Sequence, residues 1–447
     1  MVIQKYFIEN EYLPKIIKNY NYRSYQAEFS EKIYDLLSSY KTVVAEAPTG
    51  YGKTFSYLIP IFELGRRTII STKTKQLMNQ ILVKDIPNLK KILKGNDLKI
   101  ASLLGRRNYL CHYRFGKFIV PYRDMYIDVV SWVDNINEDD IILVPNDKFD
   151  GEVIGKITAD SYQCIGVKCP YINRCSFYNA KDIANNSDIV VTNHHMLLAD
   201  IAMRIKYDGS YNFDFAEHIV FDEAHSIVDI FPAYLGDELS SYSILNFIKD
   251  NRSYLGEDRF KDLYSKWKVL ISRHRNTDRL TEKMESDFKK LFDEMDKIFS
   301  SYITEEDYSI FQKYRDTFEN IYKNDGVKVV ENNGDFLSIK NIPISSGDKF
   351  VEGLKCSCIS SLMISATISF NGSFDYFMGE LGLDDTVEKI RLEPPENFMK
   401  QGKLFINDYF IDNVEDKKIF YADLMKHLKG ATLVIFNNLS HMLEIYR

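Results

Sequence analysis

Short apolar runs recur along this chain, and the stretches between them space their apolar residues three or four apart. Runs at 42–47 and 68–72 come early, those at 188–193 and 219–221 near the middle, and 362–369 follows later. Continuous apolar runs of this length, separated by helical patterns, are typical of parallel strands that are buried on both faces. The sequence therefore predicts an α/β fold built on a parallel sheet.

Residues 240–325 follow a different pattern. Apolar residues recur every three or four positions among charged ones, as in KMESDFKKLFDEMDKIF, and strand patterns are few. This spacing places the apolar side chains on one face of each helix. We expect a separate helical domain here, followed by a turn at 332–335, where Asn, Gly and Asp interrupt the pattern.

Residues 105–180 differ in composition from the stretches before and after them. Five basic residues and one acidic residue lie between Gly105 and Met125 with Tyr and Phe among them, and residues 128–150 are then acidic. Cationic side chains pair with phosphates and aromatic rings stack on bases, so the basic stretch suits binding of a single-stranded nucleic acid. The alternative is a solvated face whose aromatic rings pack into the protein.

The composition is that of a folded protein, since 45% of the 447 residues are hydrophobic and 27% are charged. A chain of this length predicts about two to four domains. The net charge of −7 argues against a general cationic coat, although it permits a local basic groove. No apolar run approaches about 18 residues, and the early acids in MVIQKYFIENEYLPK argue against a secretory signal. Six cysteines in so long a chain are not a disulfide framework, so we expect a cytoplasmic protein without a membrane span.

The segment APTGYGKT follows the first apolar run and precedes a helical pattern, FSYLIPIFEL. A Gly-containing loop in this context is typical of a P-loop, in which backbone N–H groups and the helix N-terminus hold the phosphates of a nucleotide. Lys53 would contact the β- and γ-phosphates of ATP, and the Thr54 hydroxyl would hold Mg²⁺. The alternative is an ordinary Gly-rich turn. The predicted nucleotide site comprises Ala47, Pro48, Thr49, Gly50, Tyr51, Gly52, Lys53 and Thr54.

A second acidic motif, Asp222-Glu223-Ala224-His225, closes the apolar run at 219–221. Asp222 can hold Mg²⁺, and Glu223 can activate the water that attacks the terminal phosphate. His225 would lie between the ATP site and the rest of the protein. We therefore interpret Lys53, Asp222, Glu223 and His225 as catalytic residues, whereas the same four letters in an exposed helix would be ordinary surface charge.

The cysteines form a distinctive set. Cys111 is followed at a distance by Cys164, Cys169 and Cys175, in the spacing C-x4-C-x5-C. Four thiolates can bind zinc or an iron–sulfur cluster. Zinc ribbons usually contain two C-x2-C pairs, which are absent from this sequence, so one remote and three close ligands suit a cubane cluster better. The remaining two, Cys356 and Cys358, precede a buried strand and are interpreted as core residues.

Together these motifs resemble the DinG/XPD family of iron–sulfur helicases of superfamily 2, and the chain is nearer to the bacterial DinG members. GRRNYLC resembles the family's approach to its first cluster cysteine, the segment 169–198 resembles the stretch before its DEAH box, and FLSIKNIPISSGDKF followed by SATIS resembles its approach to motif III. The loop variant A-x-T-G-x-G-K-T is also the one that superfamily 2 helicases use. The resemblance covers roughly residues 20–440 and is patchy in the helical stretch.

The resemblance implies a 4Fe–4S cluster held by the four clustered cysteines, ATP-driven 5′→3′ translocation on single-stranded or forked DNA, and opening of the duplex. It also implies roles for further residues. Gln26 would recognise adenine as in the Q-motif, Ser365 and Thr367 of the S-A-T motif would couple ATP to DNA, and His194 and His195 would be structural. The predicted DNA contacts are Thr72, Lys73, Arg106, Arg107 and Arg114.

The resemblance further implies a division into domains. Residues 1–104, 181–239 and 346–398 would form a RecA-like helicase domain, 105–180 the iron–sulfur domain as a wedge near the strand fork, 240–345 the helical arch, and 399–447 the start of a second RecA-like domain with strands at 404–408 and 431–437.

One expected motif is absent. Q-x-x-G-R-x-x-R, which supplies an arginine finger from the second RecA-like domain of these helicases, does not occur in the sequence, and 80 residues follow Thr367. An arginine finger accelerates phosphoryl transfer about 10³–10⁵-fold. We therefore expect an incomplete motor that binds ATP but hydrolyses it poorly unless a separate C-terminal half completes it. The alternatives are an ATP- and DNA-binding module without turnover and a zinc-containing ATPase.

Overall fold

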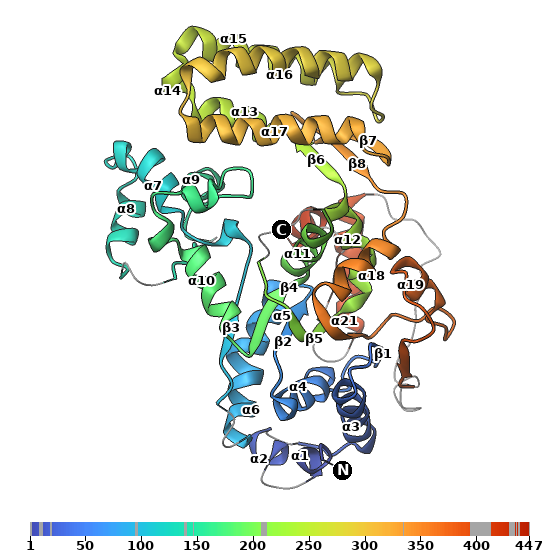
Figure 1. Ribbon diagram of the computed structural model, residues 1–447. Coiled ribbons are helices and arrows are strands. Elements are labelled where there is room, and N and C mark those ends of the chain that lie inside the picture. The colour runs from blue at the N-terminus through green and yellow to red at the C-terminus, as the bar shows by residue number, and fades with distance from the viewer. Residues whose placement is uncertain are drawn as a thin grey trace. The chain divides into compact units, whose positions relative to one another are not determined.

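The computed structural model describes residues 2–8, 12–17, 20–93, 97–137, 141–145, 147–206, 212–333, 335–393, 413–428, 434, 436 and 439–446 (Figure 1). The chain divides into two compact units, Met1–Glu393 and Pro394–Arg447. In the second unit the structure describes two helices, α21 (Val414–His427) and α22 (Leu439–Tyr446). The strands predicted at 404–408 and 431–437 lie almost entirely outside the described residues.

The first unit contains a parallel sheet of seven strands in the order β10-β1-β9-β5-β2-β4-β3. Every neighbouring pair in it is parallel, which confirms the predicted α/β fold. The sequence pattern missed β3 and β10 because both are short edge strands. The strands are β1 (Val43–Glu46), β2 (Thr68–Thr72), β3 (Ile100–Ser102), β4 (Ile189–Asn193), β5 (Ala216–Asp222), β9 (Cys358–Ser365) and β10 (Glu388–Arg391).

Both faces of this sheet are covered, as a parallel sheet requires. Alternate residues enter different cores: Val43 and Ala45 belong to one apolar cluster and Val44 to the other. One face packs on α1 (Lys5–Ile8), α2 (Leu13–Ile16), α3 (Ser24–Ser38), α4 (Lys53–Leu64), α5 (Lys75–Gln80) and α6 (Ile86–Ile92). The other packs on α10 (Ser176–Asn185), α11 (His194–Lys206), α12 (Ile227–Leu235), α18 (Gly347–Lys355) and α19 (Asp375–Glu380).

Because the strands are parallel, their carboxyl ends meet at one edge of the sheet. Glu46 of β1 pairs in register with Ser365 of β9, and Thr72 of β2 pairs with Asp222 of β5. The segments that follow these strands are the predicted P-loop, the S-A-T motif, the TKT segment and the DEAH box. The topology therefore brings four motifs that are far apart in the sequence to one edge.

A small body lies between β3 and α10. It contains α7 (His112–Phe118), α8 (Ile127–Asp134) and α9 (Gly151–Ile157). Its own apolar core is formed by Leu110, Ile119, Val129, Ile142, Val144 and Ile157.

The helical region has a core of its own, rich in aromatic side chains such as Trp267, Phe292 and Phe311. It contains α13 (Ser241–Asp250), α14 (Arg252–Leu255), α15 (Glu257–His274), α16 (Glu282–Tyr302) and α17 (Glu305–Lys323). It also packs on an antiparallel sheet in the order β6-β8-β7, formed by β6 (Asp237–Ser240), β7 (Val327–Asn333) and β8 (Phe336–Ile342). Between Ser241 and Lys323 the described elements are all helices, as the pattern of residues 240–325 predicted. The strands β7 and β8 follow this stretch and were not predicted, since polar residues such as those in VKVVENN weaken the strand pattern. Among the described helices, none is long and apolar enough to cross a membrane.

The two cysteines outside the main set differ from each other. Cys358 is buried in β9, and burial raises the pKa of its thiol to about 12, which is the behaviour of a core residue. Cys356 is exposed after the end of α18. The interpretation of Cys356 as a core residue was therefore wrong, because the chain reaches the sheet only at its next residues.

A buried histidine in β5 makes the stability of the fold depend on pH. His218 is fully buried beneath the ring of Tyr40, its Nδ1 lies 2.8 Å from Ser360 Oγ, and its Nε2 has no hydrogen-bond partner among the described residues. Burial lowers the pKa of His218 from 6.5 to about 4, and the Arg66 guanidinium acts in the same direction. The folded protein therefore keeps this ring neutral where the unfolded chain would already be protonated.

We predict that this residue lowers the free energy of unfolding as the pH falls from 6.5 toward 4, because only the unfolded state takes up the proton in that range. The loss between pH 7 and 5 should be roughly 2 kcal/mol. Urea unfolding at both pH values should show a smaller loss for His218→Gln than for the unchanged protein. Equal losses in the two proteins would contradict the assignment.

Candidate nucleotide site and cysteine region

The loop after β1 needs glycine at two positions. Gly50 and Gly52 have φ of 81° and 77°, in the left-handed region that favours glycine. A Cβ at Gly52 would lie 2.2 Å from Gln26 Nε2. Gly52 is the N-cap of α4, so Lys53 and Thr54 form the first turn of that helix, whose N-terminus attracts anions.

Two side chains from the start of the chain support this loop. Gln26 of α3 is 6% exposed, and its Nε2 donates to the Gly52 carbonyl at 3.1 Å. The Arg23 guanidinium donates to the Gly50 carbonyl. The structure therefore brings Gln26 to the phosphate loop, where its amide bonds to the loop itself.

Asp222 ends β5 and lies in the interior. Its Oδ2 accepts a hydrogen bond of 3.0 Å from the hydroxyl of Tyr57, a fully buried residue of α4. Burial raises the pKa of Asp222 to about 6; the Tyr57 hydroxyl and Lys53 oppose this, while Glu223 adds to it. Sequence reasoning missed Tyr57, although its position four residues after Lys53 places both on one face of the helix.

Glu223 adopts an unusual backbone conformation. Its φ of 61° and ψ of 46° lie in the left-handed region, which a non-Gly residue seldom adopts and which is found at functional sites more often than elsewhere. The carboxylate lies 3.8 Å from Lys53 Nζ and accepts a 3.0 Å hydrogen bond from Ser365 Oγ. The sharp turn after β5 thus directs Glu223 toward the phosphate loop.

The contacts continue from Glu223 to the TKT segment. His225 Nδ1 lies 2.8 Å from Ser365 Oγ, and His225 Nε2 lies 3.0 Å from Lys73 Nζ. Burial lowers the pKa of His225, and Lys73 acts in the same direction. A continuous series of contacts therefore runs from Lys53 through Glu223, Ser365 and His225 to Lys73.

Other predicted residues lie apart from this series. Thr72 is fully buried and its hydroxyl donates to the Thr74 carbonyl at 3.0 Å, whereas Thr367 is exposed. His194 is buried with its Nδ1 2.7 Å from Ser71 Oγ, and His195 bonds to the Tyr234 hydroxyl at 2.9 Å. These histidines contact the protein scaffold.

A further carboxylate beside the loop was not anticipated. Glu46, the last residue of β1, accepts hydrogen bonds from the Ile368 and Ser369 backbone N–H groups at 2.7 and 2.6 Å and from Ser369 Oγ at 2.7 Å. Burial alone would raise the pKa of Glu46, but the hydrogen bonds from Ser369 and Ile368 and the Arg391 guanidinium hold it below its usual range. Glu46 therefore joins the P-loop to the segment after the S-A-T motif. The sequence feature that could have revealed Glu46 is a charged residue inside the apolar run TVVAEA.

The four clustered cysteines are free and half-buried. Cys111 and Cys175 are the N-caps of α7 and α10, and Cys164 and Cys169 lie on either side of a short 3₁₀ turn, Gly166–Lys168. Burial raises the pKa of Cys111 to about 11; Arg114 opposes this, while Cys164 and Cys175 add to it. Burial also raises the pKa of the Cys169 thiol, and the nearby Cys175 and Cys164 thiols add to this increase. The four thiols are therefore electrostatic neighbours.

The donor set fits an iron–sulfur cluster in type and number, because four thiolates hold such a cluster. Among the described residues, no three His, Cys, Asp or Glu side chains are gathered tightly enough to hold a metal ion.

The predicted basic contacts differ in exposure. Arg107 has 71% of its side chain exposed and pairs with Asp160 at 2.8 Å, and the Arg106 guanidinium lies 4.3 Å from the centre of the Phe177 ring. Arg114 is only 6% exposed, donates to the Gly155 carbonyl at 2.8 Å and pairs with Asp250 at 3.3 Å. The prediction that Arg114 contacts DNA does not agree with this geometry, because its charge is directed into the protein.

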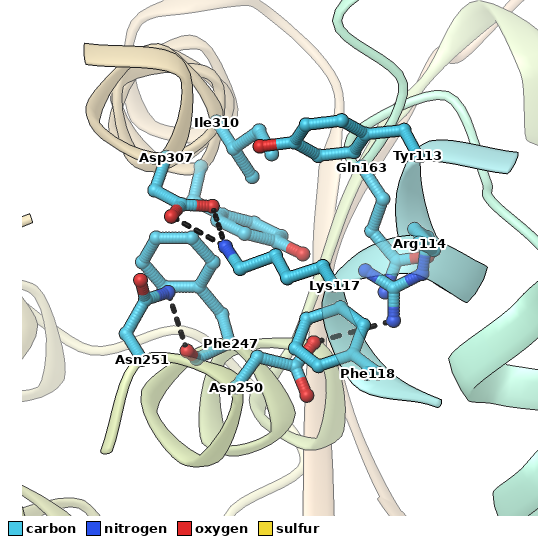
Figure 2. Close-up of a pocket in the computed structure, with 11 residues that line it drawn as sticks. Tyr113, Arg114, Lys117, Phe118, Gln163, Phe247, Asp250, Asn251, Asp307 and Ile310 are labelled. Carbon is cyan, nitrogen blue, oxygen red and sulfur yellow. Dashed lines mark hydrogen bonds and ion pairs between the residues drawn. The ribbon is translucent and has the colours of Figure 1, made fainter. Parts of the chain in front are cut away.

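Figure 2 shows the pocket at which Arg114 lies, where α7 meets α13 and α17. Lys117 of α7 forms a second ion pair there, with Asp307 Oδ1 and Oδ2 at 2.8 and 2.5 Å. Tyr113 and Phe118 also line this pocket, whereas Tyr122 of the same basic stretch is 57% exposed. The alternative interpretation of packed aromatic rings therefore holds for only part of the stretch. Two ion pairs thus join the cysteine-containing body to the helical region.

Two family models match parts of this chain. A model described as DEAD/DEAH box helicase matches residues 23–117, and one described as DEAD_2 matches residues 158–244. The first match contains the P-loop, and the second contains three of the clustered cysteines and the DEAH box.

Similar proteins include an ATP-dependent DNA helicase YoaA from Haemophilus influenzae, 29% identical over 446 residues, which cover 91% of this chain and 69% of the relative. The YoaA of Escherichia coli is 32% identical over 55% of this chain and 39% of its own length. An ATP-dependent DNA helicase DinG from Escherichia coli is 27% identical over 41% of this chain and 28% of its own length. The chain thus spans about two thirds of the first relative and less than half of the other two.

A solved structure described as XPD_Helicase resembles the fold. The two share a TM-score of 0.52 at 15% sequence identity, over 95% of this chain and 74% of that one. At this identity the likeness concerns the fold alone.

Proposed function

We propose that this chain, which is similar to YoaA and DinG helicases and is matched in part by the DEAD/DEAH box helicase and DEAD_2 models, is a DinG/XPD-type helicase of superfamily 2 and forms the ATP-binding motor region of an ATP-dependent DNA helicase that translocates 5′→3′ on single-stranded DNA and opens duplexes. The observation that carries this proposal is the series of contacts from Lys53 through Glu223, Ser365 and His225 to Lys73. It connects the phosphate loop with the segment proposed to contact DNA.

In this proposal the terminal phosphates of ATP lie at the N-terminus of α4, where Lys53 and the backbone N–H groups of the loop bind them. Thr54 and Asp222 offer the oxygen ligands that Mg²⁺ prefers, and the ion would neutralise charge on the phosphates. Glu223 orients the attacking water and accepts its proton as the bond to the departing ADP breaks. Gln26 supports the loop from the side on which the adenine would bind.

Coupling to DNA would pass through the S-A-T segment. Ser365 contacts both Glu223 and His225, so a change at the phosphates can reach Lys73 through one hydroxyl. Thr367, which is exposed, would contribute from the same loop. We propose that Lys73, Arg106 and Arg107 contact the DNA backbone, with the backbone of Thr72 placing this segment.

We further propose that Cys111, Cys164, Cys169 and Cys175 hold a 4Fe–4S cluster. The support is the number of these thiols and their mutual electrostatic influence. The corresponding domains would be RecA-like at 1–104, 181–239 and 346–398, iron–sulfur at 105–180 and arch at 240–345, with 399–447 beginning a second RecA-like domain.

Lys53→Ala tests the nucleotide site. We expect nucleotide affinity to fall by at least about tenfold and DNA-stimulated ATPase activity to disappear, because the only Lys of the loop is lost. Titration with a fluorescent ATP analogue and phosphate release with and without single-stranded DNA are the measurements. Lys75→Ala, an exposed lysine of α5, is the matched control. Unchanged ATPase activity in Lys53→Ala would show that the loop has been misassigned.

Purification under anaerobic conditions tests the cluster. The protein should be brown with about four irons per chain, since four thiolates hold one cubane, and Cys169→Ser should lose most of this iron. Cys356→Ser, which changes an exposed cysteine outside the set, should retain it. A colourless protein loaded with zinc would contradict the cluster.

The second candidate function is an ATP- and DNA-binding module that needs a separate C-terminal helicase half for turnover. It is raised by the chain's coverage of its relatives, 69% of one YoaA and 39% of another. If the chain binds nucleotide and DNA with little DNA-stimulated hydrolysis, this alternative is preferred. Rapid DNA-stimulated hydrolysis by the chain alone would exclude it.

A further inference from the structure

The loop that carries Cys164 is packed into the helical region. The Tyr162 ring stacks on Tyr314 of α17, with centroids 4.9 Å apart and planes at 10°, and its hydroxyl lies 3.2 Å from Thr317 Oγ1. Tyr162 and Ile165 also pack against the apolar core of that region. By contrast, Cys175 packs against the core of the main parallel sheet. The Cys164 loop and Cys175 are therefore held by different bodies of the protein.

A lysine of the helical region bonds to the same loop. Lys313 Nζ donates to the backbone carbonyls of Cys164 at 2.8 Å, Tyr162 at 3.3 Å and Ser161 at 3.4 Å. Three carbonyls converge on one ammonium, so the side chain determines how this part of the loop is placed. Lys313 lies between Phe311 and Tyr314 in α17, both buried in the core of the helical region, so the backbone that carries it is held firmly.

The ammonium thus lies beside a proposed cluster ligand, 2.8 Å from the carbonyl oxygen of Cys164. Positive charge beside a group that becomes more negative on reduction stabilises the reduced state. A half-buried ammonium is screened less by water than an exposed one, so its effect on such a group persists in salt.

We propose that Lys313 is a positioning residue of the metal centre, which holds the Cys164 loop in place and raises the reduction potential of the cluster. The proposal rests on the 4Fe–4S cluster proposed above. It assigns to the helical region a direct influence on the cluster, because the ammonium belongs to α17 and the ligand loop packs on that helix. A displacement of α17 would therefore change the potential.

The test compares variants of the full chain purified under anaerobic conditions. Iron content is measured first, and the midpoint potential is then measured by redox titration followed by electron paramagnetic resonance. In Lys313→Gln the midpoint should move to more negative values, because the positive charge is lost while an amide can still donate to the carbonyls. Lys313→Arg should keep both the iron and a potential close to that of the unchanged protein.

Two controls separate charge from packing. Lys323→Gln removes a lysine from the same helix whose side chain is 69% exposed and paired with Glu319, so the potential should not move. Thr317→Val removes a hydrogen-bond partner of Tyr162 without changing the charge. If weaker packing causes this variant to lose iron, the iron that it retains should still have the midpoint potential of the unchanged protein.

A Lys313→Gln protein with full iron and an unchanged midpoint would overturn the proposal. So would a Lys313→Arg protein that shifts as far as Lys313→Gln, since charge would then be irrelevant. If Lys313→Gln loses its iron, retention in Lys313→Arg supports the proposal and equal loss in both variants overturns it. An unchanged protein without iron would refute the cluster itself, and with it this role, which distinguishes the two failures.

Discussion

Glu223→Gln should lower the rate of ATP hydrolysis by about 10²–10⁴-fold while leaving nucleotide affinity within a few-fold of the unchanged protein. The amide has nearly the same shape as the carboxylate and can still accept the hydrogen bond from Ser365 Oγ. It cannot accept the proton of the attacking water, and it gives up the ion pair with Lys53 at 3.8 Å. Single-turnover hydrolysis and titration with a fluorescent ATP analogue separate these two effects.

The backbone at this position supports the choice of glutamine. Glu223 has a φ of 61°, and a smaller or β-branched residue would alter the turn as well as the chemistry. Glu217→Gln, near the opposite end of β5 and paired with Arg66, is the matched control and should hydrolyse ATP normally. If Glu223→Gln turns over as fast as this control, Glu223 is not the base.

Asp307→Ala should destabilise the helical region by about 3–5 kcal/mol, the loss expected when one partner of a buried ion pair is removed. Asp307 is 3% exposed, and the Lys117 side chain that it neutralises is 16% exposed (Figure 2). Asp307 also accepts a hydrogen bond from Thr304, the N-cap of α17. The truncation therefore leaves a buried ammonium unpaired and weakens a helix end.

Unfolding in urea is the measurement, and tryptophan fluorescence can report on this region alone. The two tryptophans are Trp132 in α8 and Trp267 in the helical core, so a Trp132→Phe background leaves only the reporter in the helical region. Asp293→Ala, which removes a partner of Arg315 that is 48% exposed, should cost less than about 1 kcal/mol.

A double variant shows whether the loss comes from the unpaired charge. Lys117→Met combined with Asp307→Leu should recover most of the stability, because apolar side chains of similar size replace buried ion pairs at little cost. If Asp307→Ala is no more destabilising than Asp293→Ala, the ion pair contributes little to the junction.

The parallel sheet could be predicted because its inner strands are continuous apolar runs. Residues 68–72 match β2, and 42–47 and 188–193 match β1 and β4 within a residue at each end. The small sheet of β6, β7 and β8 escaped prediction, because its buried residues alternate with polar ones and its pairing joins Ser240 to Ser338, nearly a hundred residues apart.

The partners of the site residues were harder to predict. Tyr57 bonds to Asp222 165 positions along the chain, and Glu46 bonds to Ser369 323 positions along it. Arg114 was predicted to contact DNA because basic residues lie near it in the sequence. In the structure its guanidinium donates hydrogen bonds to Asp250 and to the Gly155 carbonyl. Nothing local in the sequence distinguishes it from Arg107, which is exposed.

From the sequence alone, the motifs of the phosphate loop, the DEAH box and the cysteine set and the resemblance to a helicase family could be recognised, because each depends on a short pattern of residue types whose spacing is set by backbone geometry. Only the tertiary structure decided which side chains meet: that Ser365 lies between Glu223 and His225, and that Lys313 lies beside the Cys164 loop. Such contacts depend on strand order and helix packing, which are properties of the whole fold and leave no local pattern in the chain.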